Sequence, residues 1–254
     1  MSPAGDEPPR FEHVACVDST NAELLRRPRS ARAAPPTILL ADRQTAGRGR
    51  QGRTWLSDPG ASLTLSVSFE VQAAAGRLLG LPLAVGVAIA DELARHGARC
   101  ALKWPNDLYS PPPRLAKLGG ILVEVRQVGG QQRVVAGCGL NLCDGAAVTE
   151  ATAGQSVAAL FAAGAVPARE PLARSLGTAI LQASSRFLAE GLQPFAARWR
   201  ELDCLAGRIV EVRHADGRRE TGVACGIDDN GALRVSIDGR VTVLISGEVS
   251  VRAQ

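Results

Sequence analysis

The sequence predicts an α+β fold, in which a mixed or antiparallel sheet with helices is followed by a small C-terminal β-barrel of SH3-like size. Up to about Leu205, runs with the period of a strand are mixed with longer runs that have the period of a helix. From Gly207 onward only short alternating runs remain, and turn signals separate them. The 254 residues suffice for one sizeable domain with such a module appended.

The N-terminal elements follow from capping residues and from the period of the apolar positions. Asp18 or Ser19 can cap a short helix over 20–25, and an Arg-Arg-Pro cluster ends it. The β-branched and apolar run 37–41 predicts a buried strand. The run 62–70 alternates apolar residues with threonine and serine, so it predicts a strand with one buried face.

The remaining elements of the main domain begin with an apolar helical pattern over 81–96, which Gly97 ends. Further strands are predicted over 100–103, 120–126 and 133–140, and further helices over 169–191 and 194–204. We therefore expect a flexible N-terminal segment over 1–16, a main domain over 17–205 and a C-terminal domain over 206–254.

Charge and composition exclude several classes of protein. The formal net charge of +4 creates no field that requires a nucleic-acid or membrane partner. The N-terminus lacks the features of a signal peptide, and the most apolar stretch, 78–93, is shorter than the ~20 apolar residues of a membrane span. We therefore expect a cytoplasmic protein without membrane association.

The six cysteines form no CxxC pair and the three histidines are scattered, so we expect reduced, mostly buried thiols and no zinc site.

A segment rich in glycine and arginine, QTAGRGRQGR over 44–53, is the most distinctive motif. Guanidinium groups bind phosphate and carboxylate through charge-assisted hydrogen bonds, and glycines let the backbone approach a ligand. The spacing is neither that of a P-loop nor that of a Rossmann motif. Taken alone, the segment is also compatible with loose RNA binding. However, a predicted strand enters it and Trp55 with an apolar strand follows it, which favours a small-molecule site.

Three further motifs lie at predicted strand ends. The segment KWPNDL over 103–108 combines rigid and aromatic residues with an amide and a carboxylate. In KLGGILVE over 117–124, a lysine precedes a glycine pair and an apolar strand, and GCGLNL over 137–142 ends a strand with glycines and an asparagine. Each motif alone is open to a structural explanation: a turn with a buried tryptophan, a solvated lysine or a plain turn.

Together, STN at 19–21, QxxGRGRxGRxW at 44–55, KWPND, KxxGILVE and GxGxN resemble the biotin protein ligases, and the resemblance covers 17–251. It implies a class II synthetase-like catalytic domain and an SH3-like C-terminal domain. It further implies that biotin is activated with ATP as biotinoyl-5'-AMP and transferred to a lysine of the biotin carboxyl carrier protein domain of biotin-dependent carboxylases. Mg²⁺ would be carried by ATP. Because only 18 residues precede STN, a monofunctional ligase without specific DNA binding is expected.

The resemblance also implies roles for individual residues. Lys117 would be the first catalytic residue and Arg50 the second, because cations must offset the repulsion between the biotin carboxylate and the phosphates of ATP. The biotin-binding residues would be Ser19, Thr20, Asn21, Gln44, Arg48, Gly49, Arg50, Lys117 and Gly119. The ATP- and adenylate-binding residues would be Arg48, Arg50, Arg53, Trp55, Asn106, Asp107, Lys117 and Asn141.

Two other functions remain open at the level of the sequence. A lipoate ligase would use the same adenylate chemistry on a long apolar acid, although the GRGRxGR loop with KWPND favours biotin. A small RNA-binding protein would use the arginine loop and the C-terminal module, but it would leave STN, Lys117 and Asn141 unexplained. The proline-rich segment 110–114 between KWPND and Lys117 is stiff and departs from the family pattern, so it bears on where Lys117 is placed. The sequence is compatible with a monomer or a homodimer.

Overall fold

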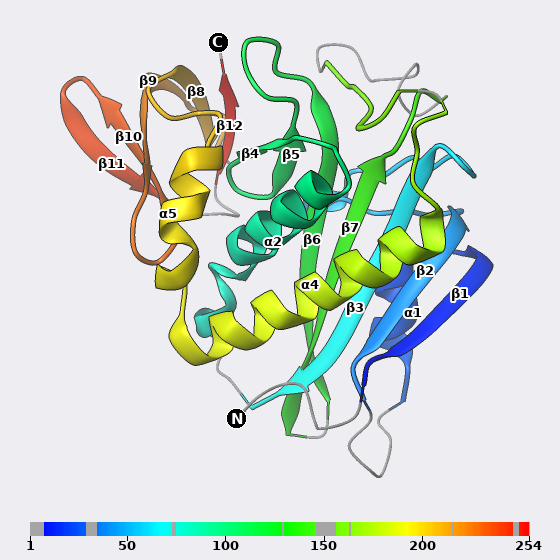
Figure 1. The fold of residues 1–254 in the computed structure, drawn as a ribbon. Coiled ribbons are helices and arrows are strands. Elements are labelled where there is room, and N and C mark those ends of the chain that lie inside the picture. Colours follow the sequence, from blue (N-terminus) through cyan, green and yellow to red (C-terminus); the bar gives the residue numbers. More distant parts are fainter. Residues whose placement is uncertain are drawn as a thin grey trace.

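The chain folds into two β-sheets with associated helices (Figure 1). A mixed seven-stranded sheet with helices precedes a five-stranded antiparallel sheet, so the predicted α+β class is confirmed. The computed structural model describes residues 8–28, 35–72, 75–128, 130–145, 156–162, 164–214, 216–245 and 249–253.

The seven-stranded sheet has the strand order β1-β2-β3-β7-β6-β5-β4. The β1–β2 pair is parallel, and the other neighbours are antiparallel. Its strands are β1 (Arg10–Val17), β2 (Thr37–Gln44), β3 (Ser62–Val71), β4 (Ala101–Lys103), β5 (Asp107–Tyr109), β6 (Lys117–Val128) and β7 (Gln131–Asn141).

Helices pack on both faces of this sheet. The helices α2 (Leu81–Arg95) and α4 (Arg169–Glu190) cover one face, α5 (Gln193–Leu202) packs beside α2, and α1 (Thr20–Arg26) lies on the opposite face (Figure 1). Of the two predicted caps, Asp18 and Ser19, the helix uses Ser19, whose side chain accepts a hydrogen bond from the backbone nitrogen of Ala22. None of the described helices is long and apolar enough to cross a membrane.

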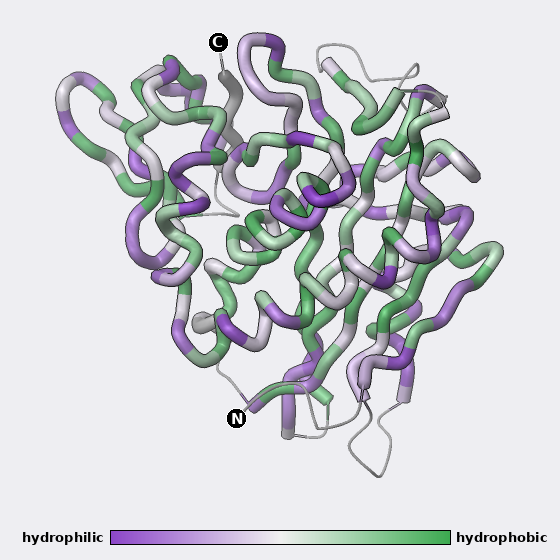
Figure 2. Tube along the Cα trace, in the orientation of Figure 1, coloured by the Kyte–Doolittle hydropathy of each residue, from purple (hydrophilic) through white to green (hydrophobic). Residues whose placement is uncertain are grey.

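The main core lies between the sheet and the two long helices. Apolar side chains of β3, such as Leu63, Leu65 and Val67, are fully buried there together with Leu81 and Ile89 of α2. Figure 2 shows hydrophobic residues concentrated along the central strands. Burying each such side chain contributes about 1.5–3 kcal/mol, so this layer holds the sheet and helices together.

The strand β3 differs from the prediction of one buried face, because both of its faces are buried. Ser62, Thr64 and Ser66 alternate with the apolar residues, and their exposed fractions are 2%, 2% and 0%. Their side is covered by α1 and by the segment that follows β2, instead of by solvent. Short hydroxyl side chains therefore mark a polar layer inside the protein, which the alternation alone does not distinguish from a solvated face.

The prediction of a flexible segment over 1–16 was wrong for residues 10–16, which belong to β1 and pair with β2. Residues 1–7 lie outside the described residues. The strand has charged and polar side chains at Arg10, Glu12 and His13, and as an edge strand it needs no continuous apolar pattern. The three-residue strand β5 was also missed, because it is too short to show a period.

The second sheet forms the C-terminal part of the chain, with the strand order β11-β10-β9-β8-β12. A turn of this sheet packs on the main domain: the Gly231 oxygen accepts a hydrogen bond of 3.0 Å from Trp104 Nε1. Gly231 has a φ of 84°, and a Cβ there would lie 2.7 Å from Leu83, so the contact requires glycine. The strands are β8 (Ile209–His214), β9 (Arg219–Ile227), β10 (Leu233–Ile237), β11 (Arg240–Leu244) and β12 (Val249–Ala253).

Candidate active site

A cavity of about 720 Å³ lies on the face of the seven-stranded sheet that carries α1. Glycines form part of its floor: Gly120 of β6 lies opposite Gly139 of β7, and Gly137 lies two residues before Gly139. A Cβ on Gly137 would lie 2.1 Å from Asn21 Oδ1, and one on Gly139 would lie 2.3 Å from the Trp55 ring. The glycines of the GxGxN motif therefore let two other cavity residues approach the sheet.

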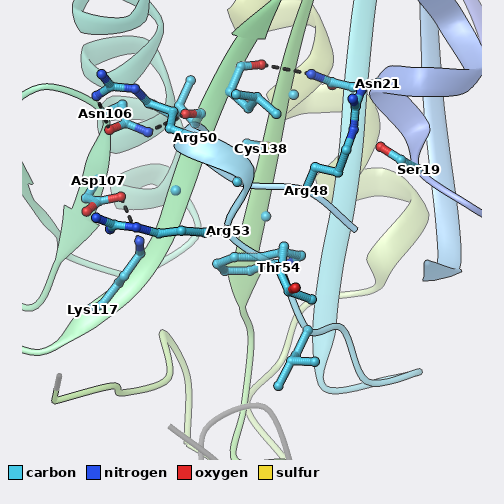
Figure 3. Close-up of a pocket in the computed structure, with 18 of the residues that line it drawn as sticks. Ser19, Asn21, Arg48, Arg50, Arg53, Thr54, Asn106, Asp107, Lys117 and Cys138 are labelled. Atoms are coloured by element: carbon cyan, nitrogen blue, oxygen red, sulfur yellow. Dashed lines mark hydrogen bonds and ion pairs between the residues drawn. The ribbon is translucent and has the colours of Figure 1, made fainter. Parts of the chain in front are cut away.

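One end of the cavity is a network of uncharged polar groups. Gln44 Oε1 accepts hydrogen bonds from the backbone nitrogen of Thr20 at 2.8 Å and from Thr20 Oγ1 at 3.1 Å. Ser66 Oγ lies 2.6 Å from both Thr20 Oγ1 and Asn21 Oδ1. Ser19 completes this end at the start of α1 (Figure 3). The network presents fixed donors and acceptors to a small polar head group.

The glycine-arginine segment forms a small hairpin over the cavity. Arg48 pairs with Thr54 as an antiparallel bridge. The backbone nitrogen of Trp55 donates a hydrogen bond of 2.9 Å to the backbone oxygen of Gly47. A Cβ on Gly47 would lie 2.5 Å from the Trp55 oxygen, so this close approach requires glycine. The tip of the hairpin contains a short helical turn, Arg50–Gly52.

The three arginines of the hairpin point to different parts of the cavity. Arg48 pairs with Glu124 near the polar network, and Arg50 donates a hydrogen bond of 3.1 Å to Asn106 Oδ1 at the other end. Arg53 points toward the region of Asp107 (Figure 3). Burial lowers the pKa of Arg50 below its ordinary value. Asp107 partly offsets this effect and the neighbouring Arg53 adds to it, but a guanidinium stays protonated at neutral pH.

Lys117 lies at the charged end of the cavity. Its Nζ is 2.8 Å from Asp107 Oδ1, and its side chain is 19% exposed. Its backbone is held by the segment 156–158, because the Lys117 nitrogen donates to the Ser156 oxygen and the Ala158 nitrogen to the Lys117 oxygen. The segment 110–114 precedes it without displacing it from the cavity. Lys117, Arg50 and Arg53 therefore concentrate positive charge at one end.

The structure brings together all of the predicted site residues except one. Gly119 does not line the cavity, and a Cβ there would lie 2.5 Å from the Gly139 oxygen, so it permits close strand packing instead. Sequence reasoning missed Ser66, whose only signal was a serine on a predicted strand, and Glu124, the last residue of the KxxGILVE motif. The predicted residues that line the cavity are Ser19, Thr20, Asn21, Gln44, Arg48, Gly49, Arg50, Arg53, Trp55, Asn106, Asp107, Lys117 and Asn141.

Cys138 also lines the cavity, and its environment allows a prediction about its reactivity. Burial raises the pKa of the Cys138 thiol to about 12, and likewise those of Cys100 and Cys204. At pH 8 these thiols stay protonated, so iodoacetamide should modify the exposed Cys16 and Cys225 first. Mass spectrometry of the alkylated protein checks this order, and unfolded protein, in which all six cysteines should react, is the control. Equal rates for Cys138 and Cys16 would contradict the prediction.

Comparisons with known proteins identify related sequences and folds. Residues 13–141 match the model of the biotin/lipoate A/B protein ligase family, and residues 206–252 match that of the biotin protein ligase C-terminal domain. The chain is 36% identical to the bifunctional ligase/repressor BirA of Escherichia coli over 93% of this chain and 72% of BirA. It is 34% identical to the biotin–[acetyl-CoA-carboxylase] ligase of Mycobacterium tuberculosis over 94% and 88% of the two chains. The solved structure of a biotin protein ligase from Aquifex aeolicus in complex with biotin and ATP has the same fold, with a TM-score of 0.76, 24% identity and coverage of 96% and 99%.

Proposed function

This chain belongs to the biotin/lipoate A/B protein ligase family, and from that membership we propose that it is an ATP-dependent biotin protein ligase. It activates biotin as biotinoyl-5'-AMP and then transfers biotin to a lysine of a biotin carboxyl carrier protein domain. The observation that carries this proposal is the division of one cavity into an uncharged polar end and a cationic end. The uncharged polar end suits the ureido ring of biotin. The cationic end suits the biotin carboxylate and the triphosphate of ATP, which react with each other there.

In the first step, a carboxylate oxygen of biotin attacks the α-phosphorus of ATP, and the bond from that phosphorus to pyrophosphate breaks. Lys117 and Arg50 offset the repulsion between the two anions. At an effective dielectric constant near 20, one cation at ~4 Å contributes about 4 kcal/mol, so two cations supply a substantial share of the barrier reduction. The adenosine and phosphate groups of ATP are held by Arg53, Trp55, Asn106, Asp107 and Asn141.

In the second step, the amine of the carrier lysine attacks the carbonyl carbon of the adenylate, and the bond to AMP breaks. The mixed anhydride must survive until the amine arrives. The glycine-arginine hairpin lies over the cavity and carries Arg48, Gly49 and Arg50, so it shields the anhydride from water. The polar network of Ser19, Thr20, Asn21 and Gln44 retains the biotin head.

The donor set fits a magnesium ion that enters on the phosphates of ATP. Among the described residues that line the cavity, Asp107 is the one carboxylate, and Lys117 already pairs with it. No group of three potential metal ligands occurs among the described residues. Mg²⁺ is commonly held by substrate phosphates with one or two carboxylates, and here it would neutralise phosphate charge, with Asp107 as its nearest protein partner.

The proposal also covers the protein that accepts biotin, the cellular location and the oligomeric state. The partner is a carrier domain of a biotin-dependent carboxylase, and the described elements are expected to bind no specific DNA sequence. A cytoplasmic location agrees with the need for ATP and with six free cysteines. The protein acts as a monomer or a homodimer. Its catalytic domain contains the seven-stranded sheet, including β1, and ends near residue 205, and its C-terminal domain covers 206–254.

We expect the purified protein to transfer labelled biotin to an isolated carrier domain in the presence of ATP and magnesium. The chain contains two lysines, Lys103 and Lys117, so labelling of the carrier is readily separated from labelling of the enzyme by mass spectrometry. A carrier domain whose acceptor lysine is replaced by arginine is the control. Absence of transfer to the unmodified carrier would contradict the proposed function.

Thermal unfolding separates this function from the two alternatives. Biotin should raise the melting temperature, because a ligand that binds only the folded state stabilises it by mass action. Lipoate and a single-stranded oligonucleotide at the same concentrations should leave the melting temperature unchanged. A larger shift with lipoate would identify a lipoate ligase, and a shift with the oligonucleotide alone would identify a nucleic-acid-binding protein.

A further inference from the structure

Glu124 of β6 contacts two parts of the candidate site that come from distant segments. Its carboxylate lies near Arg48 of the glycine-arginine hairpin, with Nη2 at 3.1 Å from Oε1 and 3.2 Å from Oε2. The same Oε2 accepts a hydrogen bond of 2.9 Å from Asn21 Nδ2 of α1. Glu124 therefore links the hairpin over the cavity to the polar network at its base.

The hydrogen bond between Glu124 and Asn21 determines how the amide of Asn21 is oriented. Asn21 Nδ2 donates to Glu124 and also to the Leu122 oxygen at 3.0 Å, and both partners only accept hydrogen bonds. If the amide were flipped, its oxygen would face two acceptors. The observed orientation instead directs Oδ1 toward Ser66 Oγ at 2.6 Å, over Gly137. Both N–H groups of Asn21 are thus used by the protein, and its oxygen remains the acceptor on the cavity side.

The ion pair between Glu124 and Arg48 holds the hairpin near the cavity. Arg48 is bridged to Thr54 within the hairpin, and its guanidinium reaches across the cavity edge to the strand β6. The pair is partly exposed, with 46% of the Arg48 side chain and 26% of the Glu124 side chain accessible. Such pairs contribute little to the stability of the fold. A role of this pair in placing the hairpin can therefore be tested without unfolding the protein.

We propose that Glu124 is a positioning residue, which orients the Asn21 amide for the biotin head and anchors the hairpin through Arg48. The proposal rests on the proposed ligase function. Glu124 does not line the cavity itself, so it acts through these two residues. It should affect the binding of biotin and the retention of the adenylate more than the chemical step.

The test compares wild-type protein with Glu124→Gln in biotin-dependent exchange of pyrophosphate into ATP. A glutamine has the same size, but it loses the charge that faces Arg48, and its NH2 group must face one of two donors, Arg48 or Asn21. Loss of a charge-assisted hydrogen bond corresponds to roughly tenfold or more in affinity, so we expect KM for biotin to rise about tenfold. The value of kcat and the KM for ATP should change by less than about threefold, as expected for an interaction equal in ground and transition states.

A second readout follows the hairpin. Preformed adenylate should be lost from the isolated complex faster in Glu124→Gln than in wild type. Arg48→Met should show a similar loss. Both variants break the Arg48–Glu124 contact, so the effect of the double variant should be smaller than the sum of the two single effects.

Glu70→Gln is the matched control, since Glu70 pairs with Arg133 at 2.7 Å on the same sheet, with 23% exposure, away from the cavity. It should change the melting temperature without changing KM for biotin. An active wild type whose KM and adenylate loss are unchanged in Glu124→Gln would overturn this inference alone. A wild type without biotin-dependent exchange would overturn the proposed function and this inference with it.

Discussion

Replacing Lys117 by alanine should abolish biotin-dependent exchange of pyrophosphate into ATP. The Nζ of Lys117 lies 2.8 Å from Asp107 Oδ1 at the cationic end of the cavity. Its removal takes away one cation and the ion-pair partner of the Asp107 carboxylate, which would then repel the incoming phosphates and carboxylate more strongly. Loss of one preorganised electrostatic group of this kind lowers kcat by about 10²–10³-fold, and the added repulsion from Asp107 should bring the loss to roughly 10³-fold or more.

The exchange assay measures this loss without any carrier protein, so it isolates the first step. Arg126→Ala is the control on the same strand, because Arg126 is exposed and its side chain bonds to the Leu25 backbone, outside the cavity. It should keep near-normal exchange. The melting temperature of Lys117→Ala should stay close to that of wild type. Exchange within about tenfold of wild type in Lys117→Ala would refute the assigned role of this residue, since a group that offsets anion repulsion is worth more.

Gly139→Ala should weaken nucleotide binding strongly. The added Cβ would lie 2.3–2.6 Å from three atoms of the Trp55 ring, which are closer than any real contact. The backbone of Gly139 cannot retreat, because β7 pairs with β3 on one side and with β6 on the other. Trp55 must therefore leave its position, and overpacking of this kind costs about 1–3 kcal/mol.

If Trp55 holds the adenylate, this cost appears as a loss of roughly tenfold or more in the affinity for a nonhydrolysable ATP analogue. Isothermal titration calorimetry measures it in the presence of biotin. Gly76→Ala is the control, since nothing lies within 4 Å of a Cβ there. Unchanged nucleotide affinity in a folded Gly139→Ala protein would remove Trp55 from the proposed nucleotide site.

Local patterns predicted most of the main elements. The capping serine at Ser19 and the apolar period of α2 depend on neighbouring residues, so they are visible in the chain itself. The edge strand β1 and the short strand β5 were missed, because their stability comes from pairing with distant strands. The burial of Ser62, Thr64 and Ser66 was also missed, since α1 and the segment that follows β2 cover that face only after folding.

The ordered motifs around Asn21, Arg50, Lys117 and Asn141 were enough to predict the reaction class, through their resemblance to the biotin protein ligases. How those side chains are held became visible in the folded protein alone. It assigned Gly119 to strand packing and added Glu124, which joins the hairpin to α1. The physical reason is that a functional side chain can be recognised by its chemistry, whereas its orientation depends on partners that are remote in the chain and close only after folding.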